Sequence, residues 1–273
     1  MKQRRNGSRA VSRWVYGSTY MDLLVKLLGW KSTILHGDPC VYDRWRWITR
    51  HLQRGPLRTL DAGCGSGAFS LYAATVGNEC VGVSFQENEV MKARRRAALL
   101  GLSVTFIQAD LRQLDGFEWS PFDQIICTET IEHIQDDRKL IRDFARLLKP
   151  GGRLILSTPF ELCNPLLGDR ISDHEDGGHV RPGYTHQQLR RLFDENDICT
   201  KSEEYVSGVV TQELTNLMRM LGRINGRLAW CLTLPFRALG VLDRPLTALA
   251  RHPYLSLAVV GVKRLPDNGE KRG

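Results

Sequence analysis

The chain lacks the features that organise disulfide-rich, zinc-ribbon and membrane-spanning proteins. Its seven cysteines are scattered, and no two of them form a Cys-x-x-Cys pair. An odd number of unpaired cysteines indicates reduced thiols and argues against a disulfide framework or a zinc ribbon. The apolar run at residues 228–242 is interrupted by Pro235 and Arg237 and is too short to cross a bilayer. No apolar signal segment follows the basic N-terminus, so we expect a cytoplasmic protein.

Excess positive charge is absent from the middle of the chain and is concentrated at both ends. Residues 1–50 hold 10 Lys and Arg against 3 Asp and Glu, and residues 219–273 hold the same numbers. Residues 51–218 hold 18 Lys and Arg against 24 Asp and Glu. The whole chain of 273 residues has a formal charge of +8. Basic flanks suit an anionic lipid surface, a nucleic acid or an anionic substrate, and they equally suit an ordinary solvated surface.

A glycine-rich turn, Leu60-Asp61-Ala62-Gly63-Cys64-Gly65-Ser66-Gly67, follows a short apolar run and precedes a helical pattern. Glycine is needed where the backbone turns sharply or lies against a ligand, because it has no Cβ that would collide. A strand, a glycine-rich turn and a helix in this order predict a nucleotide-binding loop. An isolated run of this kind is also compatible with a plain tight turn.

Strand and helix patterns alternate from residue 58 onward, which predicts a parallel sheet covered by helices on both faces. The predicted strands are residues 58–61, 80–84, 104–108, 124–128, 153–157, 200–206 and 254–263. The predicted helices are residues 15–28, 39–53, 68–76, 87–100, 136–148 and 185–195, with a helical pair around Pro235 over residues 212–250. Residues 159–184 predict a long loop rich in Gly, Asp, His and Pro, and a loop of this length is often functional.

We divide the chain into four parts on this basis. Residues 1–54 are a helical cap that begins with a disordered basic arm at residues 1–13, and residues 55–207 are the α/β core. Residues 208–252 are a helical insert, and residues 253–273 are the final strand and a disordered tail.

Ligands of an open parallel sheet bind at the carboxyl ends of its strands. Four predicted strand ends carry residues suited to binding: the glycine loop, Ser84-Phe85, Asp110-Leu111 and residues 128–133. The amides of the loop suit the amino-acid part of a cofactor. A carboxylate at Asp110 can accept a hydrogen bond from an adenine amino group.

These stretches together resemble the class I S-adenosylmethionine (SAM)-dependent methyltransferases. The matching segments are LDAGCGSGAFS, VGVSFQENEV, FIQADLRQLD, FDQIICTETIEHIQD and LLKPGGRLILSTP, in the expected order over residues 58–207. The resemblance implies a Rossmann-like, seven-stranded, mostly parallel sheet with an antiparallel last strand. It also implies SAM as the cofactor, with the first motif at its methionine part, the second at its ribose and the third at its adenine. The implied cofactor-binding residues are Asp61, Gly63, Cys64, Gly65, Gly67, Ser84, Phe85, Asp110, Leu111 and Thr128.

Ser84 departs from the family pattern, in which most members place an acidic residue at the end of the second strand to bind the ribose hydroxyls. Gln86 or Glu87 would have to compensate. A Ser or Thr at this point followed by a Glu-Asn pair is similar to the cyclopropane fatty acid synthases and the tocopherol-type methyltransferases. The ribose partner therefore stays open.

The segment Glu129-Thr130-Ile131-Glu132-His133 gathers two carboxylates and a histidine at the fourth strand end. Carboxylates suit Mg²⁺, and a histidine tolerates Mn²⁺ or a softer ion. The pattern is similar to that of the ubiquinone-biosynthesis O-methyltransferases and the small-RNA 3′-end 2′-O-methyltransferases, where it binds metal. We hypothesise a divalent-cation site of Glu129, Glu132, His133 and His179, chosen over His174 and His186. In the alternative, Glu132 and His133 brace the loop or contact the substrate without a metal.

The implied reaction is an in-line displacement in which a substrate nucleophile attacks the sulfonium methyl group, so catalysis rests largely on proximity and alignment. His133 would be the base for an oxygen nucleophile, with Glu132 beside it, unless a metal lowers the hydroxyl pKa. Residues 228–242 have the composition of an interfacial element that would attach the protein peripherally to a membrane, or of a cap helix over the active site.

We therefore predict O-methylation of a small hydrophobic acceptor of quinone, phenol or lipid type. One alternative is an RNA 2′-O-methyltransferase, although no RNA-binding module accompanies the core and a nucleic-acid partner is disfavoured. Another is a non-catalytic SAM-binding scaffold subunit. The sequence does not predict the oligomeric state.

Overall fold

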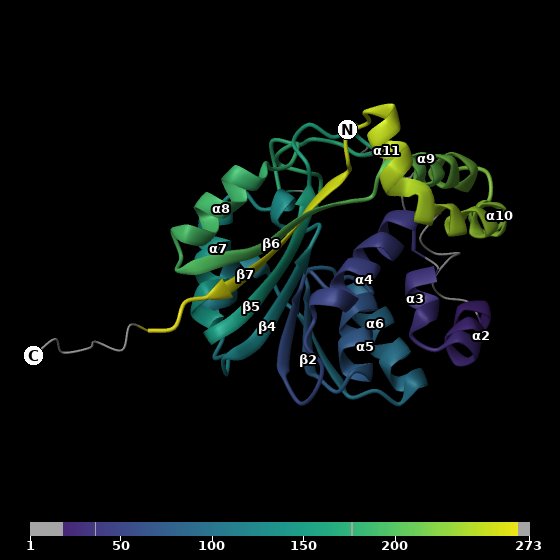
Figure 1. Cartoon of the computed structure of the whole chain (residues 1–273). Coiled ribbons are helices and arrows are strands. Elements are labelled where there is room, and N and C mark those ends of the chain that lie inside the picture. The colour runs from purple at the N-terminus through teal and green to yellow at the C-terminus, as the bar shows by residue number, and fades with distance from the viewer. Residues whose placement is uncertain (1–18, 36, 176, 267–273) are drawn as a thin grey trace, which may run out of the picture.

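A seven-stranded sheet forms the centre of the protein in a computed structural model that describes residues 19–35, 37–175 and 177–266 (Figure 1). The strand order is β3-β2-β1-β4-β5-β7-β6. Six strands run in the same direction, and β7 runs opposite to them. The predicted fold class is confirmed. The strands are β1 (Arg58–Ala62), β2 (Glu79–Ser84), β3 (Val104–Gln108), β4 (Phe122–Thr128), β5 (Leu148–Pro159), β6 (Ile198–Val206) and β7 (Ser256–Lys263).

Two layers of helices cover the sheet because successive strand residues point to opposite faces. Ile125 of β4 is buried against one layer, and the adjacent Ile126 is buried against the other. The first layer contains α7 (Asp137–Leu147), α8 (His186–Asp194) and the short turn η1 (Leu111–Gly116). The second contains α4 (Pro39–His51) and α5 (Ala68–Thr75), with α6 (Glu87–Leu100) beside them (Figure 1).

Local signals in the sequence explain where these helices begin and end. The side chain of Asp136 caps α7 by accepting the N–H of Lys139, and Thr185 forms a capping box with Gln188 at the start of α8. The helix α6 ends at Gly101, whose φ of 63° is easily adopted only by glycine. The predicted bounds of α6 and β3 therefore match the structure, and those of the other core elements differ at their ends.

The helical insert differs from its prediction. In place of a helical pair over residues 212–250, the structure has α9 (Val209–Gly222), α10 (Gly226–Thr233), η3 (Leu234–Leu242) and α11 (Asp243–Ala250). Pro235 stands in the first turn of η3, at the predicted division of the pair. The further break before α10 has a local cause, because the Asn225 side chain caps this helix. The prediction also missed the short helix α3 (Lys31–Leu35).

The insert packs against the N-terminal helices α3 and α4, whereas α2 (Thr19–Leu28) packs against α3 and α6 (Figure 1). The indole N–H of Trp230 donates to the carbonyl of Leu35 at 2.8 Å, and the guanidinium of Arg237 donates to the carbonyls of Leu35 and Gly37. These contacts join two segments that lie at opposite ends of the sequence. The predicted arm at residues 1–13 and the end of the predicted tail, residues 267–273, lie outside the described residues.

Candidate functional site

The carboxyl ends of the parallel strands meet at one edge of the sheet. The register pairs Ala62 with both Val83 and Cys127, so the residues that follow β1, β2 and β4 lie side by side. A cavity of about 400 Å³ opens there. Six residues predicted from the sequence line it: Gly63, Gly65, Ser84, Phe85, Asp110 and Leu111.

The three positions of the loop require glycine for different structural reasons. Gly65 has a φ of 49°, and a Cβ added there would meet no protein atom within 4 Å, so its open side faces the cavity. A Cβ on Gly63 would lie 2.2 Å from the hydroxyl oxygen of Thr130. A Cβ on Gly67 would lie 3.0 Å from Ala93 and Phe106. Gly63 and Gly67 thus permit close packing of the loop, whereas Gly65 leaves room for a ligand.

The other four predicted residues, Asp61, Cys64, Gly67 and Thr128, do not line this cavity. The Asp61 carboxylate is buried and accepts a hydrogen bond from the Ser70 hydroxyl at 2.5 Å, and burial raises its pKa to about 6. The Cys64 thiol is also buried, which raises its pKa and keeps it protonated. The Thr128 carbonyl accepts the Thr130 hydroxyl at 2.9 Å. These residues lie outside the cavity lining and support the loop and the end of β4 through buried contacts.

One wall of the cavity is formed by an ion-paired arginine. The guanidinium of Arg112 contacts both Asp110 and Glu175, and this hydrogen bonding holds the pKa of the Asp110 carboxyl below its usual range. At the second strand end, Gln86 and Glu89 line the cavity and Glu87 does not. Gln86 is therefore the one of the two suggested ribose partners that reaches the cavity.

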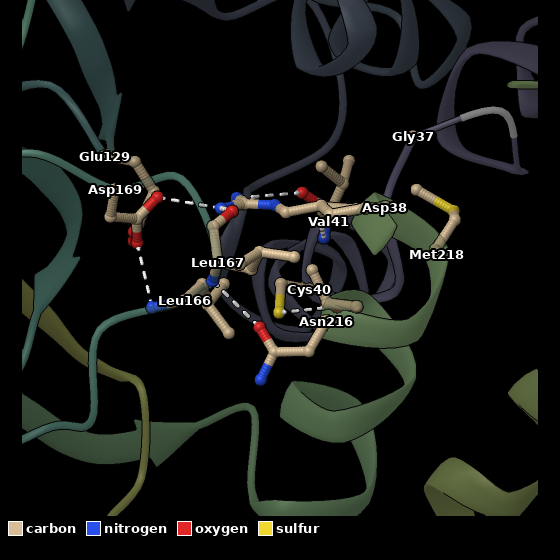
Figure 2. A network of polar contacts seen from close by, with 12 residues as sticks. Gly37, Asp38, Cys40, Val41, Glu129, Leu166, Leu167, Asp169, Asn216 and Met218 are labelled. Atoms are coloured by element: carbon tan, nitrogen blue, oxygen red, sulfur yellow. Dashed lines mark hydrogen bonds and ion pairs between the residues drawn. The ribbon is translucent and has the colours of Figure 1, made fainter. Parts of the chain in front are cut away.

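A second cavity of about 490 Å³ adjoins the first, and Glu129 and His133 line both. Its walls come from α4, from α9 and from the loop at residues 159–184, which has no helix and no strand among its described residues beyond Pro159. Figure 2 shows a network of polar contacts among these segments, with Glu129 and Asp169 at one side of it and Asp38, Cys40 and Asn216 further along. Two cavities that meet at shared side chains can hold two reactants in contact.

Glu129 has an unusual backbone, with a φ of 46° that non-glycine residues rarely adopt. Its carboxylate accepts hydrogen bonds from the hydroxyls of Ser157 at 3.1 Å and Ser256 at 3.3 Å. The guanidinium of Arg44 lies 3.7 Å from the same carboxylate. The side chain is thus held by hydroxyls and a cation of the protein itself.

Glu132, His133 and His179 form a tighter cluster, in which one ligand atom from each lies within 4.8 Å of the others. The Glu132 carboxyl is fully buried; the Thr158 hydroxyl donates to its Oε2 at 3.0 Å, while its Oε1 has no hydrogen-bond partner. Burial and the charge of Glu129 raise the pKa of Glu132 well above its usual range. The orphaned Oε1 and the two imidazoles fit a divalent cation, and Glu129 is not part of this cluster.

His133 is oriented by a hydrogen bond from its Nδ1 to the carbonyl of Gly178 at 2.9 Å. A carbonyl only accepts, so the proton is on Nδ1, and Nε2, 3.9 Å from Glu132, is left with a lone pair. The ring of His179 packs against it at 4.8 Å, and burial together with His133 lowers the pKa of His179. His186 lies elsewhere, against Tyr205.

Comparison with known families decides what this domain is. Residues 60–156 match the family model described as "Methyltransferase domain". This region is a class I SAM-dependent methyltransferase domain. SAM is the cofactor of the family, and the match spans the glycine loop, the first four strand ends and β5 as far as Leu156.

Several curated relatives of the methyltransferase domain share one name. The chain is 33% identical over 115 residues to the "Ubiquinone biosynthesis O-methyltransferase" of Xanthomonas axonopodis pv. citri (strain 306). The matched segment covers 42% of this chain and 48% of that protein. It is 36% identical over 102 residues to the protein of the same name from Caulobacter sp. (strain K31), covering 37% of this chain and 40% of the relative. The chain thus matches about half the length of these relatives or less.

Solved structures share the fold of the methyltransferase domain. The cyclase SpnF matches with a TM-score of 0.58 and 21% identity, over 82% of this chain and 81% of that chain. The magnesium protoporphyrin IX methyltransferase of Synechocystis PCC 6803, solved with bound SAM, matches with a TM-score of 0.51 and 17% identity, over 96% of this chain and all of the other. At these identities the likeness establishes the fold alone.

Sequence reasoning missed several residues that shape the methyltransferase site. Arg112 stands two positions after Asp110 and could have been noted as a neighbour of the third motif. Arg44 gives no local signal, because it reaches the site from α4 through a contact that only the folded chain makes. The hydroxyls that hold Glu129 come from β5 and from β7 and are likewise distant in sequence.

Proposed function

We propose that the chain transfers the methyl group of SAM to an oxygen of a small hydrophobic acceptor of quinone, phenol or lipid type. The observation that carries the proposal is the meeting of two cavities at His133 and Glu129. Methyl transfer needs the sulfonium methyl and the nucleophile in line and in contact, which two adjoining cavities provide. The name shared by the curated relatives supports an oxygen acceptor.

The glycine-loop cavity is the proposed SAM site. Gly63 and Gly65 would lie against the methionine part of the cofactor, with Ser84 and Phe85 near the ribose. Asp110 and Leu111 would border the adenine. The buried residues Asp61, Cys64, Gly67 and Thr128 would support this site by holding the loop and the end of β4. Titration of the purified chain with SAM tests this assignment directly.

His133 is the proposed general base. Its Nδ1–H is fixed on the Gly178 carbonyl, so Nε2 is positioned to accept a proton from an acceptor hydroxyl as the oxygen attacks. Glu132 lies beside Nε2 at 3.9 Å and would stabilise the imidazolium that forms. We expect His133→Gln to lower kcat by about 10²- to 10⁴-fold while the SAM dissociation constant stays within threefold of the wild type. An equal loss of SAM affinity would assign His133 to cofactor binding.

A divalent cation is the alternative to the histidine base. Glu132, His133 and His179 would hold it; Nε2 of His133 would then be a ligand and not a base, and the cation would instead lower the pKa of the acceptor hydroxyl. Activity of the protein dialysed against EDTA, with and without added Mg²⁺, Mn²⁺ or Zn²⁺, tests this alternative. Full activity in EDTA would remove the cation and leave His133 as the base on its own.

We also propose that the helical insert, residues 208–252, attaches the protein peripherally to an anionic membrane. No helix in the described part of the chain is long and apolar enough to cross a bilayer. The insert nevertheless exposes a large apolar surface with arginines at its edges, which suits an interface between water and lipid. Its exposed apolar side chains include Ile224, Leu228, Leu232, Phe236, Leu239, Val241, Leu246 and Leu249, and its exposed arginines include Arg223, Arg227 and Arg251.

Labelled SAM distinguishes the acceptor classes. The full chain is incubated with cell extract and SAM carrying an isotopic methyl label, and the label is followed into lipid and RNA fractions. We expect a product in the lipid fraction. A product confined to RNA would replace the proposal by the RNA alternative, and SAM binding without any labelled product would favour a scaffold subunit. Sedimentation with anionic and with neutral vesicles tests membrane attachment separately.

A further inference from the structure

We propose that the acceptor carries an oxyanion, a carboxylate or a phosphate, and that Arg44 of α4 binds it in the second cavity. The inference rests on the proposed function for the statement that this cavity holds the acceptor. It adds a chemical class to that acceptor and a specificity-determining residue that lies outside the matched methyltransferase domain.

Arg44 is a buried guanidinium with too few partners. Its side chain lines the second cavity and is 11% exposed. Its one ion pair among the described residues is with Glu129, at 3.7 Å, and no described residue accepts a hydrogen bond from it. A guanidinium has five N–H donors, and a buried charge without hydrogen bonds is costly. An oxyanion in the cavity would supply the missing acceptors, two of them in the paired geometry that guanidinium groups favour.

The other charges of the cavity leave room for one anion. Arg219 is paired with Asp169 at 2.7 Å and lies 3.7 Å from Asp38. At the rim, the exposed Arg170 makes no side-chain ion pair or hydrogen bond with a described residue. Besides the carboxylates beside Arg219, Arg44 and Arg170 share the cavity with Glu129 and Glu132. Glu129 is also held by two hydroxyls, and the pKa of the buried Glu132 is raised well above its usual range.

The cavity can present such an acceptor to the reacting centre. Arg44 and His133 line the same space of about 490 Å³, so one molecule can contact both with different groups. The walls between them are partly apolar, which suits the ring or chain that would join an oxyanion to a hydroxyl. The apolar lining residues are Pro159, Pro165, Leu166, Ile171, Pro182 and Leu255.

A pair of isosteric probes tests the inference without any need for turnover. The full chain, saturated with S-adenosylhomocysteine, is titrated calorimetrically with 3,4-dihydroxybenzoate and with the neutral 3,4-dihydroxybenzamide. We expect the carboxylate to bind about tenfold more tightly or better, which is the scale of a hydrogen bond to a charged group. Phenyl phosphate compared with phenol extends the test to the second source of an oxyanion and shows which of the two the site prefers.

Variants assign the preference to Arg44. We expect Arg44→Gln to reduce the carboxylate preference to within twofold and Arg44→Lys to keep part of it, since a lysine retains the charge without the planar fork. Arg46→Gln, an exposed position two residues further along α4 that does not line this cavity, is the matched control and should bind like the wild type. Retained affinity for S-adenosylhomocysteine in each variant shows that the fold is intact.

Equal binding of the charged and neutral probes by the wild type, for both oxyanions, would overturn the inference even if no variant folds. So would an Arg44→Gln protein that keeps the full preference. The proposed function fails in a different way, by an absence of SAM binding or of methyl transfer to any acceptor. A protein with an Arg44-dependent oxyanion preference and no methyl transfer would keep the inference and lose the function.

Discussion

Replacing Gly65 by valine adds side-chain atoms to the glycine-loop cavity without a collision with the protein. The open side of Gly65 faces that cavity, and no protein atom lies within 4 Å of a Cβ built there. The Cβ of the new side chain would therefore lie in the space proposed for the cofactor and clear of the surrounding protein atoms. The substitution separates the effect of lost cofactor space from the effect of damaged packing, which the neighbouring glycines cannot do.

Two costs are expected, and they act on different quantities. The φ of 49° at Gly65 is unfavourable for a residue with a Cβ, which lowers the free energy of unfolding by about 1–2 kcal/mol. The isopropyl group in space meant for a ligand costs the complex about 1–3 kcal/mol, the usual range for overpacking. The second cost corresponds to a SAM dissociation constant raised by about 5- to 150-fold.

Gly101→Val is the matched control. Gly101 ends α6 with a φ of 63°, is exposed, and has no heavy atom within 4 Å of a built Cβ, so it carries a similar backbone strain far from any cavity described above. Urea denaturation should show similar losses of stability in both variants. Calorimetric titration should show weakened SAM binding in Gly65→Val alone. A SAM affinity of Gly65→Val within twofold of the control would refute the placement of the cofactor against this loop.

Three further predictions concern stability. Burial raises the pKa of Asp61 from 3.8 to about 6, so between these pH values the folded protein keeps a proton that the unfolded chain has released. The contribution of this proton to the free energy of unfolding is complete below pH 3.8, and about 3 kcal/mol is lost as the pH rises through 6. Asp61→Asn cannot ionise, and urea denaturation should show no such fall between pH 4.5 and 7; a parallel fall in both proteins would contradict the burial argument. Gly261→Ala in β7 would place a Cβ 2.3 Å from the side chain of Ile198 in β6. This substitution should lower the free energy of unfolding by about 1–3 kcal/mol and leave the SAM affinity unchanged. Asp243→Ala removes the acceptor of the N–H groups that begin α9, among them that of Gly208 at 2.7 Å, and should cost at least about 2 kcal/mol, measured by chemical denaturation; a neutral effect would mean that water replaces the carboxylate.

The sheet could be predicted from the sequence because its signals are local. Short apolar runs followed by helical periodicity mark each strand and its crossover, and a terminal glycine such as Gly101 fixes a helix end. The insert was predicted less well. The division at Pro235 was predicted, but the break before the Asn225 cap and the start of α11 at Asp243 were not, so two expected helices correspond to four short segments.

The candidate site was likewise predicted where its signals are local and missed where they come from contacts distant in sequence. Six of the ten predicted cofactor residues line a cavity because each lies at, or within three residues after, the carboxyl end of a strand whose position is fixed by the parallel register. The remaining four are buried beside it, where a motif does not distinguish contact from support. Of the four predicted metal ligands, three cluster and Glu129 does not, since Arg44, Ser157 and Ser256 hold its carboxylate through contacts distant in sequence.

Glu129 lines both cavities, and its partners come from parts of the chain that the family match does not cover. It lies within the matched region, residues 60–156, but its orientation depends on Arg44 and Ser256, which lie outside that region. The carboxylate is held by Arg44 and by the hydroxyls of Ser157 and Ser256, which explains why it does not join Glu132, His133 and His179. If the further inference holds, one residue of the N-terminal cap, Arg44, would also set the charge that the second cavity accepts. The family match thus bears on SAM, and the acceptor has to be sought through α4 and the loop at residues 159–184.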